Sequence, residues 1–167
     1  MKTDMHSASV MGNNLSISTK HAIVISNYIR GKRLAWAKQK LNLVLSFKNA
    51  IPFTVHNKKI GHRKGHMGSG RYPINATKEV LSLLNSAEHN ASDKGLDVES
   101  LYISSIIPNQ AARPWHAGRQ RRTKMKRTHL KIILEEKVNE KKSDKKEIAK
   151  ESVIKKTTKK VEKKEVK

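Results

Sequence analysis

The sequence predicts an α+β fold, in which three helices pack on a small antiparallel sheet from which a long β-hairpin protrudes, followed by a disordered C-terminal tail. Three observations lead to this prediction. Apolar residues recur at helical spacing in three stretches before residue 94, two β-favouring stretches enclose a long basic connection, and the composition changes sharply after Glu136. The expected order is strand, helix, helix, loop, helix, and two strands joined by the hairpin.

The charge of the chain predicts the kind of partner. Among 167 residues there are 36 Lys and Arg against 14 Asp and Glu, a formal net charge of +22. This balance favours nucleic acid or an anionic membrane surface as partner. The longest purely apolar run, residues 22–25, is far shorter than the roughly 20 residues of a membrane-spanning helix. We therefore expect a cytoplasmic protein without a membrane partner.

The residues that most enzymes and metal sites need are missing. There is no cysteine, which excludes disulfides, thiolate nucleophiles and cysteine metal sites, and the GxSxG, HExxH and phosphate-loop motifs are absent. His62 and His66 are four residues apart, but glycines break any helix between them and no acidic residue lies between Asn49 and Pro73. We expect no metal, no cofactor and no catalytic activity.

Composition divides the chain into a flexible N-terminus at residues 1–14, a folded domain at residues 15–136 and a disordered tail at residues 137–167. The tail holds 13 Lys and 6 acidic residues, so no face can bury enough area to offset chain entropy. Residues 1–136 hold 23 Lys and Arg against 8 acidic residues, a net charge of +15. The folded domain is therefore strongly basic in its own right.

Within this domain the polarity pattern places the regular elements before the hairpin. Residues 15–18 alternate and predict a short strand. The first helix should begin at Ser18 or Thr19, whose hydroxyl can accept a hydrogen bond from a first-turn amide. Apolar stripes predict a second helix over about residues 32–48 and a third over about residues 75–93. The glycine-rich stretch between them predicts a loop.

The connection between the last two strands is too long and too basic for an ordinary turn. Hairpin loops usually span about 2–5 residues, and clustered cations repel one another until an anion neutralises them. We interpret residues 101–134 as an arm that binds RNA or DNA, with an exposed indole for stacking at its tip. Its candidate contacts are Arg113, Trp115, Arg119, Arg121, Arg122, Lys124, Lys126 and Arg127.

The glycine-rich loop before the third helix offers a second basic surface. One interpretation is that its backbone amides and cations lie against phosphates, and the plainer one is a solvated run of charge. The candidate contacts in this loop are Lys58, Lys59, Arg63, Lys64 and Arg71.

Three stretches together carry a resemblance to a known family. They read IRGKRLAWA, IPFTVHNKKIGHRKG with GRYPINATKEVLSLLNSAEHNASDKGLD, and PWHAGRQRRTKMKRTHLKIIL. Over roughly residues 15–136 the chain resembles the large-subunit ribosomal protein L-twenty-two family, called L-seventeen in eukaryotes, in its archaeal and eukaryotic form. Where the family usually reads PRAxGRA, this chain has Trp115 in place of an arginine, and the outgoing limb of its arm is several residues shorter.

The resemblance implies a structural constituent of the large ribosomal subunit that acts in translation. It implies binding to ribosomal RNA, neighbouring ribosomal proteins as partners, and a hairpin tip that helps to form the wall of the nascent-peptide exit tunnel and can meet the nascent chain. Carried over residue by residue, it implies RNA contacts at Arg30, Lys32, Arg63, Arg71, Arg119, Lys126 and Arg127.

Two alternatives from other classes stay open at this point. The first is a free basic protein that compacts DNA, which would bind duplex DNA as well as RNA and would need no hairpin. The second is a metal-dependent RNA-processing enzyme, for which the histidines of the loop are the only support.

Overall fold

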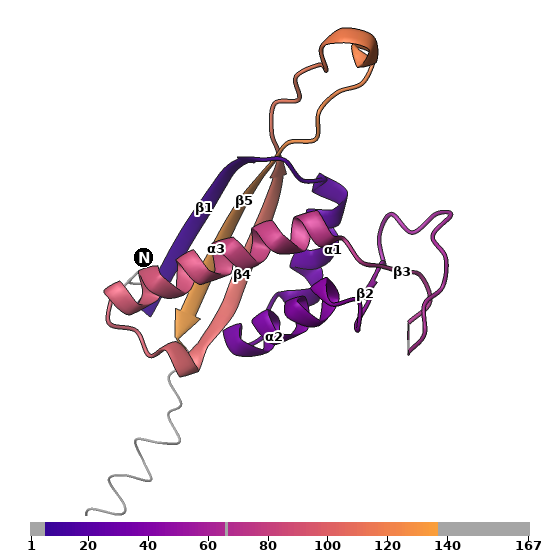
Figure 1. Cartoon of the computed structure of the whole chain (residues 1–167). Helices are drawn as coiled ribbons and strands as arrows, with labels where there is room; N and C mark the ends of the chain where they lie inside the picture. Colours follow the sequence, from indigo (N-terminus) through magenta and orange to yellow (C-terminus); the bar gives the residue numbers. More distant parts are fainter. Residues whose placement is uncertain (1–5, 66, 137–167) are drawn as a thin grey trace, which may run out of the picture. The chain divides into compact units, whose positions relative to one another are not determined.

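A three-stranded antiparallel sheet forms the base of the domain. The computed structural model describes residues 6–65 and 67–136, so the tail expected at residues 137–167 lies outside the described part. The strands are β1 (Ser7–Leu15), β4 (Leu101–Gln110) and β5 (Thr128–Glu136), in the order β1-β5-β4 (Figure 1). The central position of β5 means that both of its edges are hydrogen-bonded.

Alternation along the strands creates one apolar face. In β5 the side chains of Thr128, Leu130, Ile132 and Leu134 are buried, and those between them are not. A bulge in β4 between Ile103 and Ser105 shifts the register by one residue. Side chains of a strand normally alternate between its two faces. The extra residue of the bulge shifts this alternation by one position, so Ile103 and Ile106 lie on the same face although they are three residues apart.

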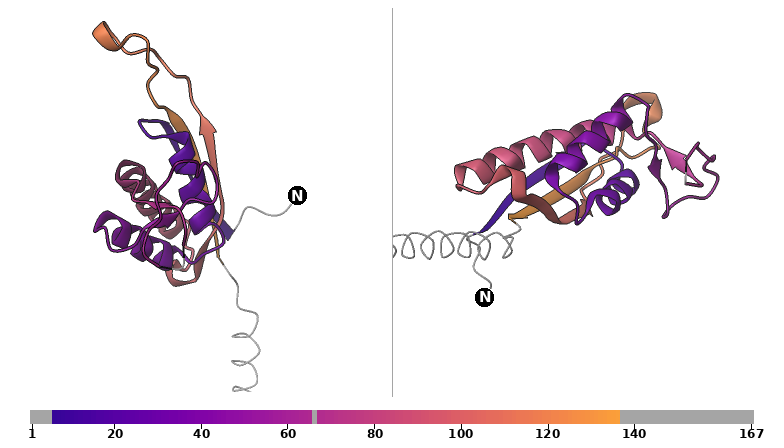
Figure 2. Two further views of the ribbon diagram at one scale, coloured as in Figure 1. Left: turned by 90° about the vertical axis from the view of Figure 1, so that its right-hand side faces the viewer. Right: turned by 90° about the horizontal axis from the view of Figure 1, so that it is seen from below.

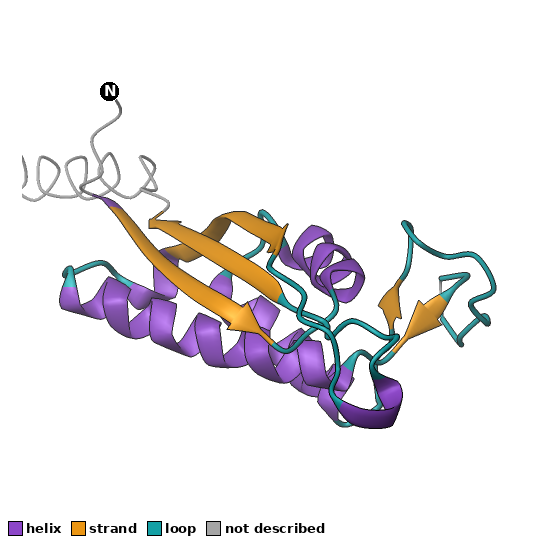
Figure 3. Cartoon of the chain, turned by 90° about the horizontal axis from the view of Figure 1, so that it is seen from above, coloured by secondary structure: helices purple, strands orange, loops and turns teal. Residues whose placement is uncertain are grey.

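Three helices cover this apolar face. They are α1 (Thr19–Ile29), α2 (Leu34–Leu45) and α3 (Ile74–Asp93), and all lie on one side of the sheet (Figure 2, left; Figure 3). Helix α3 packs along β1 and β5, α1 packs on β4, and α2 packs on α3. The largest fully buried side chains are Ile25, Ile29, Leu34, Leu41, Ile51, Leu84, Leu101, Ile103, Ile106, Leu130, Ile132 and Leu134. The predicted α+β class, with three helices on a small antiparallel sheet and a projecting hairpin, is confirmed.

The junction between α1 and α2 is tied to the edge of the sheet. Gly31 has φ +71°, and its amide donates to the carbonyl oxygen of Ile103 at 2.8 Å. The amide of Ile103 donates in turn to the carbonyl oxygen of Lys32 at 2.9 Å. These two bonds extend the pairing of β4 across its outer edge, so the turn between the helices is held against the sheet.

The N-terminal prediction was wrong in its boundaries. Residues 7–14, expected to be flexible, form most of β1, and the strand expected at residues 15–18 is absent apart from Leu15. Small residues explain the weak sequence signal. A Cβ on Gly12 would lie 2.8 Å from Leu83 Cδ1, so β1 lies close to α3 at this glycine. Residues 1–5 lie outside the described part.

Helix and loop boundaries also differ in detail from the predictions. The second helix is shorter than the expected residues 32–48. Ser18 is the N-cap of α1 but makes no capping hydrogen bond, and the Thr19 hydroxyl bonds Thr128 instead. The loop before α3 contains a short antiparallel pair, β2 (Ile51–Pro52) and β3 (Gly70–Arg71).

The projecting part of the hairpin is shorter than residues 101–134. Residues 101–110 and 128–136 belong to the sheet, so only residues 111–127 extend beyond it, and we call this segment the arm (Figure 1). Short 3-10 turns lie before β4, at η2 (Val98–Ser100), and in the arm, at η3 (Gly118–Gln120).

The central strand gives a direct test of the core. Replacement of Ile132, which is fully buried between β1 and β4, by alanine should lower the free energy of unfolding by about 2–5 kcal/mol, because it leaves a cavity. Replacement of its exposed neighbour Lys131 by alanine should change it by about 0.5 kcal/mol or less. Urea unfolding measures both values, and equal losses would contradict the described register.

Candidate nucleic-acid interface

The arm has a partly hydrogen-bonded backbone. The amide of Ala111 donates to the carbonyl oxygen of Arg127 at 3.2 Å, that of Met125 to Pro114 at 2.8 Å, and that of His116 to Thr123 at 3.0 Å. The two limbs are therefore joined at three levels. The arm carries five Arg and two Lys and no acidic residue. The cationic side chains of the arm are therefore carried by a backbone that hydrogen bonds hold in place.

The tip of the arm combines an exposed indole with cations. Trp115 is 58% exposed and forms an isolated bridge with Lys124, whose Nζ lies 4.4 Å from the centre of the indole. Such a cation–π contact holds the lysine over one face of the ring. Arg119, Arg121 and Arg122 are exposed around the turn. The tip therefore presents an aromatic surface within a strongly positive field.

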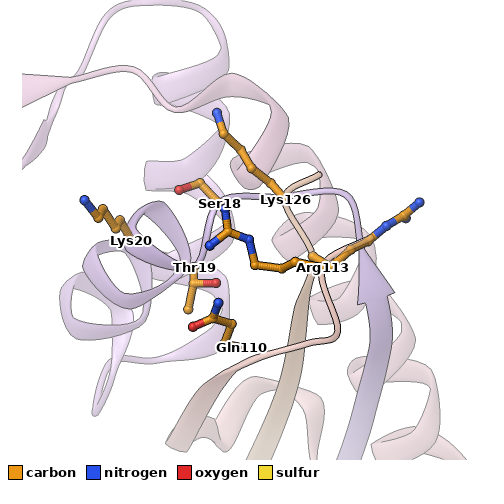
Figure 4. Close-up of a pocket in the computed structure, with 7 residues that line it drawn as sticks. Ser18, Thr19, Lys20, Gln110, Arg113 and Lys126 are labelled. Atoms are coloured by element: carbon orange, nitrogen blue, oxygen red, sulfur yellow. The ribbon is translucent and has the colours of Figure 1, made fainter. Parts of the chain in front are cut away.

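A cavity of about 430 Å³ opens where the arm meets the start of α1, and we call it the arm-root cavity. Figure 4 shows its side chains grouped between the first turn of α1 and the base of the arm. It is lined by Ser18, Thr19, Lys20, Gln110, Arg113, Lys126 and Arg127. Four of these are cations and none is acidic. A cavity lined by several cations and no acidic residue suits an anionic group such as a phosphate.

Hydrogen bonds fix the walls of the arm-root cavity. The hydroxyls of Thr19 and Thr128 are 2.9 Å apart, and Thr128 also donates to the carbonyl oxygen of Ile17 at 3.0 Å. A guanidinium nitrogen of Arg127 donates to the carbonyl oxygen of Asn14 at 3.0 Å. These bonds lock the start of α1 to the first residues of β5.

A second cavity, of about 330 Å³, lies next to the first and shares Ser18 and Lys126 with it. It reaches the first turn of α3, and we call it the α3 cavity. Its lining also includes His21 and Tyr72. Burial lowers the pKa of His21 below its ordinary value, and the charges of Lys126 and Arg71 lower it further. The histidine is therefore neutral near pH 7 and senses the cations around the cavity.

Both cavities meet the N-terminus of a helix. Neither α1 nor α3 has an acidic residue in its first turn, and neither N-cap side chain makes a capping bond. The free amides and the helix dipole both favour an anion at such an end. The backbone therefore adds to the attraction that the cationic side chains exert.

Acidic residues are scarce around the arm. From residue 5 to residue 78 the sequence has no Asp or Glu. In the described part the acidic residues are Glu79, Glu88, Asp93, Asp97, Glu99, Glu135 and Glu136. Those of β5 sit where that strand pairs with the first residues of β4, away from the arm. Of the seven, Glu79 is nearest to the start of α3, and the others follow later in the sequence.

The predicted contact residues fall into three groups. Arg113, Lys126 and Arg127 converge on the arm root, and the predicted residues 115–124 occupy the tip. The basic loop keeps Lys58, Lys59, Arg63, Lys64 and Arg71 exposed.

Arg30 and Lys32 form the third group and do not line these cavities. A nitrogen of Arg30 donates to the carbonyl oxygen of Ile106 at 3.0 Å, and Lys32 Nζ lies 5.7 Å from the ring of Trp36. Sequence reasoning missed Lys20 and His21. The available signal was their position in the first turn of a predicted helix, where no acidic residue accompanies Lys20.

The described residues contain no group of three His, Asp or Glu side chains able to hold a metal ion, and His66 is not among them. In the same part of the chain, no helix is both long and apolar enough to cross a bilayer.

An α+β domain with a cationic hairpin arm and two cavities lined by cations has the architecture of a polyanion-binding protein. The family model described as ribosomal protein L22p/L17e matches residues 10–135. The chain therefore belongs to this family of ribosomal proteins, whose members are structural and not enzymes.

Relatives in archaea agree with this assignment. The chain is 41% identical over 136 residues to large ribosomal subunit protein uL22 of Methanococcus vannielii, a match that covers 77% of this chain and 89% of that protein. It is 40% identical over 136 residues to uL22 of Nanoarchaeum equitans, covering 77% and 78%. The uL22 of Methanococcoides burtonii is 38% identical over 135 residues, covering 78% and 89%.

His21 provides a pH-dependent test of the α3 cavity. A phosphate that neutralises Lys126 and Arg71 should raise the pKa of His21, so phosphate binding takes up a proton at His21 and this contribution strengthens binding as the pH falls through the phosphate-bound pKa. NMR titration of the His21 ring with and without inorganic phosphate measures the shift. Lys126→Ala should raise the pKa without phosphate and reduce the phosphate-dependent change. If the pKa of His21 did not change when phosphate was added, no phosphate would bind in the α3 cavity.

Proposed function

We propose that this ribosomal protein is a structural constituent of the large subunit that binds ribosomal RNA through its arm and the cavities at the arm root. The observation that carries the proposal is the arm-root cavity, which four cations from two distant segments line and which has no acidic residue in its lining. Membership of the L22p/L17e family and relatives named as large-subunit proteins support it.

The kind of cation favours RNA over a loose polyanion. Arginine presents a planar fork that binds phosphate through two bonds and stacks on bases, whereas lysine acts as a point charge. Arginine is more frequent than lysine in the arm. Two of the arm arginines, Arg113 and Arg127, donate to backbone carbonyls, which leaves their charge uncompensated. Such groups can contact phosphates at fixed positions along a folded RNA.

The proposed RNA-binding surface has two parts. The primary part is the arm with its root, and the basic loop with the α3 cavity adds the second. Neighbouring ribosomal proteins are further partners, and the exposed apolar side chains Met11 and Ile107 lie on the uncovered face of the sheet, beside Lys131 of β5.

The arm root can be tested by removal of two lysines that the structure shows to line it. Lys20→Ala with Lys126→Ala should weaken binding to purified large-subunit ribosomal RNA and reduce the slope of log Kd against log salt by about 1.5, since each lost phosphate contact lowers it by about 0.7–0.9. Filter binding at four salt concentrations measures both changes.

A matched control removes the same charge elsewhere. Lys94 lies at the acidic end of α3 and Lys131 on the uncovered face of the sheet, and both are exposed. Their double alanine variant should keep the wild-type slope. Equal slopes for the two double variants would show that net charge, rather than the arm root, governs binding.

We also propose that the tip of the arm borders the nascent-peptide exit tunnel, as the family resemblance implies. Exposure of Trp115 at the end of a projecting arm supports this placement. A photoreactive benzoylphenylalanine in place of Trp115 should crosslink to tunnel RNA and to a stalled nascent chain in purified ribosomes. The same group in place of Val98, at the other end of the sheet, should crosslink to neither. Crosslinks from both positions would refute the placement.

A free DNA-compacting protein remains the alternative with a distinct expectation. Such a protein would leave large subunits in a sucrose gradient at high salt and would bind any duplex with equal affinity. A protein built into the subunit should co-sediment with it under the same conditions.

A further inference from the structure

Three side chains outside the arm form an aromatic cluster that the sequence analysis did not identify. The rings of Phe47 and Tyr72 are 5.4 Å apart between centroids and inclined by 58°. The guanidinium carbon of Arg63 lies 5.5 Å from the centre of the Tyr72 ring. Phe47 follows α2, Arg63 lies in the basic loop, and Tyr72 precedes α3. Residues from three segments therefore meet at one point on the surface.

The backbone of Phe47 is in a conformation that phenylalanine rarely adopts. Its φ is +59°, in the left-handed region. The amide of Phe47 donates to the carbonyl oxygen of Val44 at 3.1 Å, and that of Lys48 to Leu43 at 2.9 Å. These two bonds form a Schellman motif, in which glycine usually occupies the left-handed position because it has no Cβ. In this protein α3 ends in that way, at Gly95 with φ +74°.

Packing does not account for the phenylalanine. The side chain of Phe47 is 64% exposed, the largest exposure among the large hydrophobic side chains of the described residues. A bulky ring is thus kept at a strained position although most of its surface faces solvent. Strained residues of this kind cluster at binding sites, where the strain serves a contact with a partner.

The rest of the cluster is held in place more firmly. Tyr72 is half-buried and packs against the core. A Cβ on Gly70 would lie 3.0 Å from Arg63 Cγ, so the arginine side chain packs directly over this glycine. The amide of Arg63 donates to the carbonyl oxygen of Gly68 at 3.1 Å. The support behind the exposed ring is therefore ordered by several independent contacts.

The electrostatic surroundings identify the chemistry of the partner. No Asp or Glu occurs between residues 5 and 78, while Lys48 follows Phe47 directly and Arg63 completes the cluster. Tyr72 also lines the α3 cavity with Lys126. The exposed ring thus adjoins a basic cavity suited to a phosphate. A flat aromatic group that is linked to a phosphate matches both features, and a nucleotide has this composition.

We propose that Phe47 is a stacking site for an unpaired base of the bound RNA, with the backbone phosphate of the same strand directed toward the α3 cavity. This inference rests on the proposed RNA binding and adds a base contact to it. The occupant is a nucleobase rather than a protein side chain because Arg63 in the cluster, Lys48 beside Phe47 and the basic α3 cavity lined by Tyr72 all favour a group that carries a phosphate.

Phe47→Gly separates the function of the ring from its effect on the fold. Glycine relieves the left-handed strain, so the thermal midpoint should stay unchanged or rise. The probes are a 12-nucleotide oligoadenylate and an abasic strand of the same length, which carries the same charge without bases. The wild-type full-length chain should prefer oligoadenylate, and Phe47→Gly should lose about fivefold or more of that preference, because it removes one base-stacking contact.

Two controls define the outcome. Val98→Ala removes another exposed apolar side chain at the acidic end and should retain the full preference. A 5-iodouridine strand should also crosslink to the peptide that contains Phe47. If Phe47→Gly kept the wild-type preference for oligoadenylate, the stacking site would be overturned. Absence of the crosslink in the wild-type chain would overturn it as well, and the surface would then fit a protein neighbour. That result would leave the salt dependence of Lys20→Ala with Lys126→Ala intact, whereas a failure of RNA binding itself would abolish it.

Discussion

The arrangement depends on strand β5, which is hydrogen-bonded on both edges and buries every second side chain. The strand leaves the arm and enters the core within a few residues, because Thr128 bonds both Thr19 and Ile17. The arm therefore has a rigid base although it projects beyond the sheet. The same bonds bring the start of α1 against the arm and create the cavity between them.

A folded protein that concentrates cations at one place must orient them without cancelling their charge. In this domain backbone carbonyls perform that task, since Arg127 donates to Asn14, Arg113 to Met125 and Arg30 to Ile106. A carboxylate partner would fix the guanidinium equally well but would compete with phosphate. The salt bridge between Lys38 and Glu88 joins α2 to α3 and does not involve the arm.

Much of the fold follows from the sequence because apolar spacing is strong in α3 and in β5. The pattern failed at β1, where Ala8 and Gly12 fill buried positions that larger residues usually mark. The arm was predicted from its length and charge. The residue at which it leaves the sheet depends on how far β4 and β5 remain paired, and no local sequence signal specifies that position. Phe47 was missed because a single aromatic residue in a loop is unremarkable until its φ and its neighbours are known.

The concentration of cations on the arm gives that end of the domain a strongly positive potential. In the field of a polyanion the arm is therefore attracted first and approaches ahead of the rest of the domain. Productive encounters become more frequent than random collision allows, and added salt slows association before it weakens the final complex.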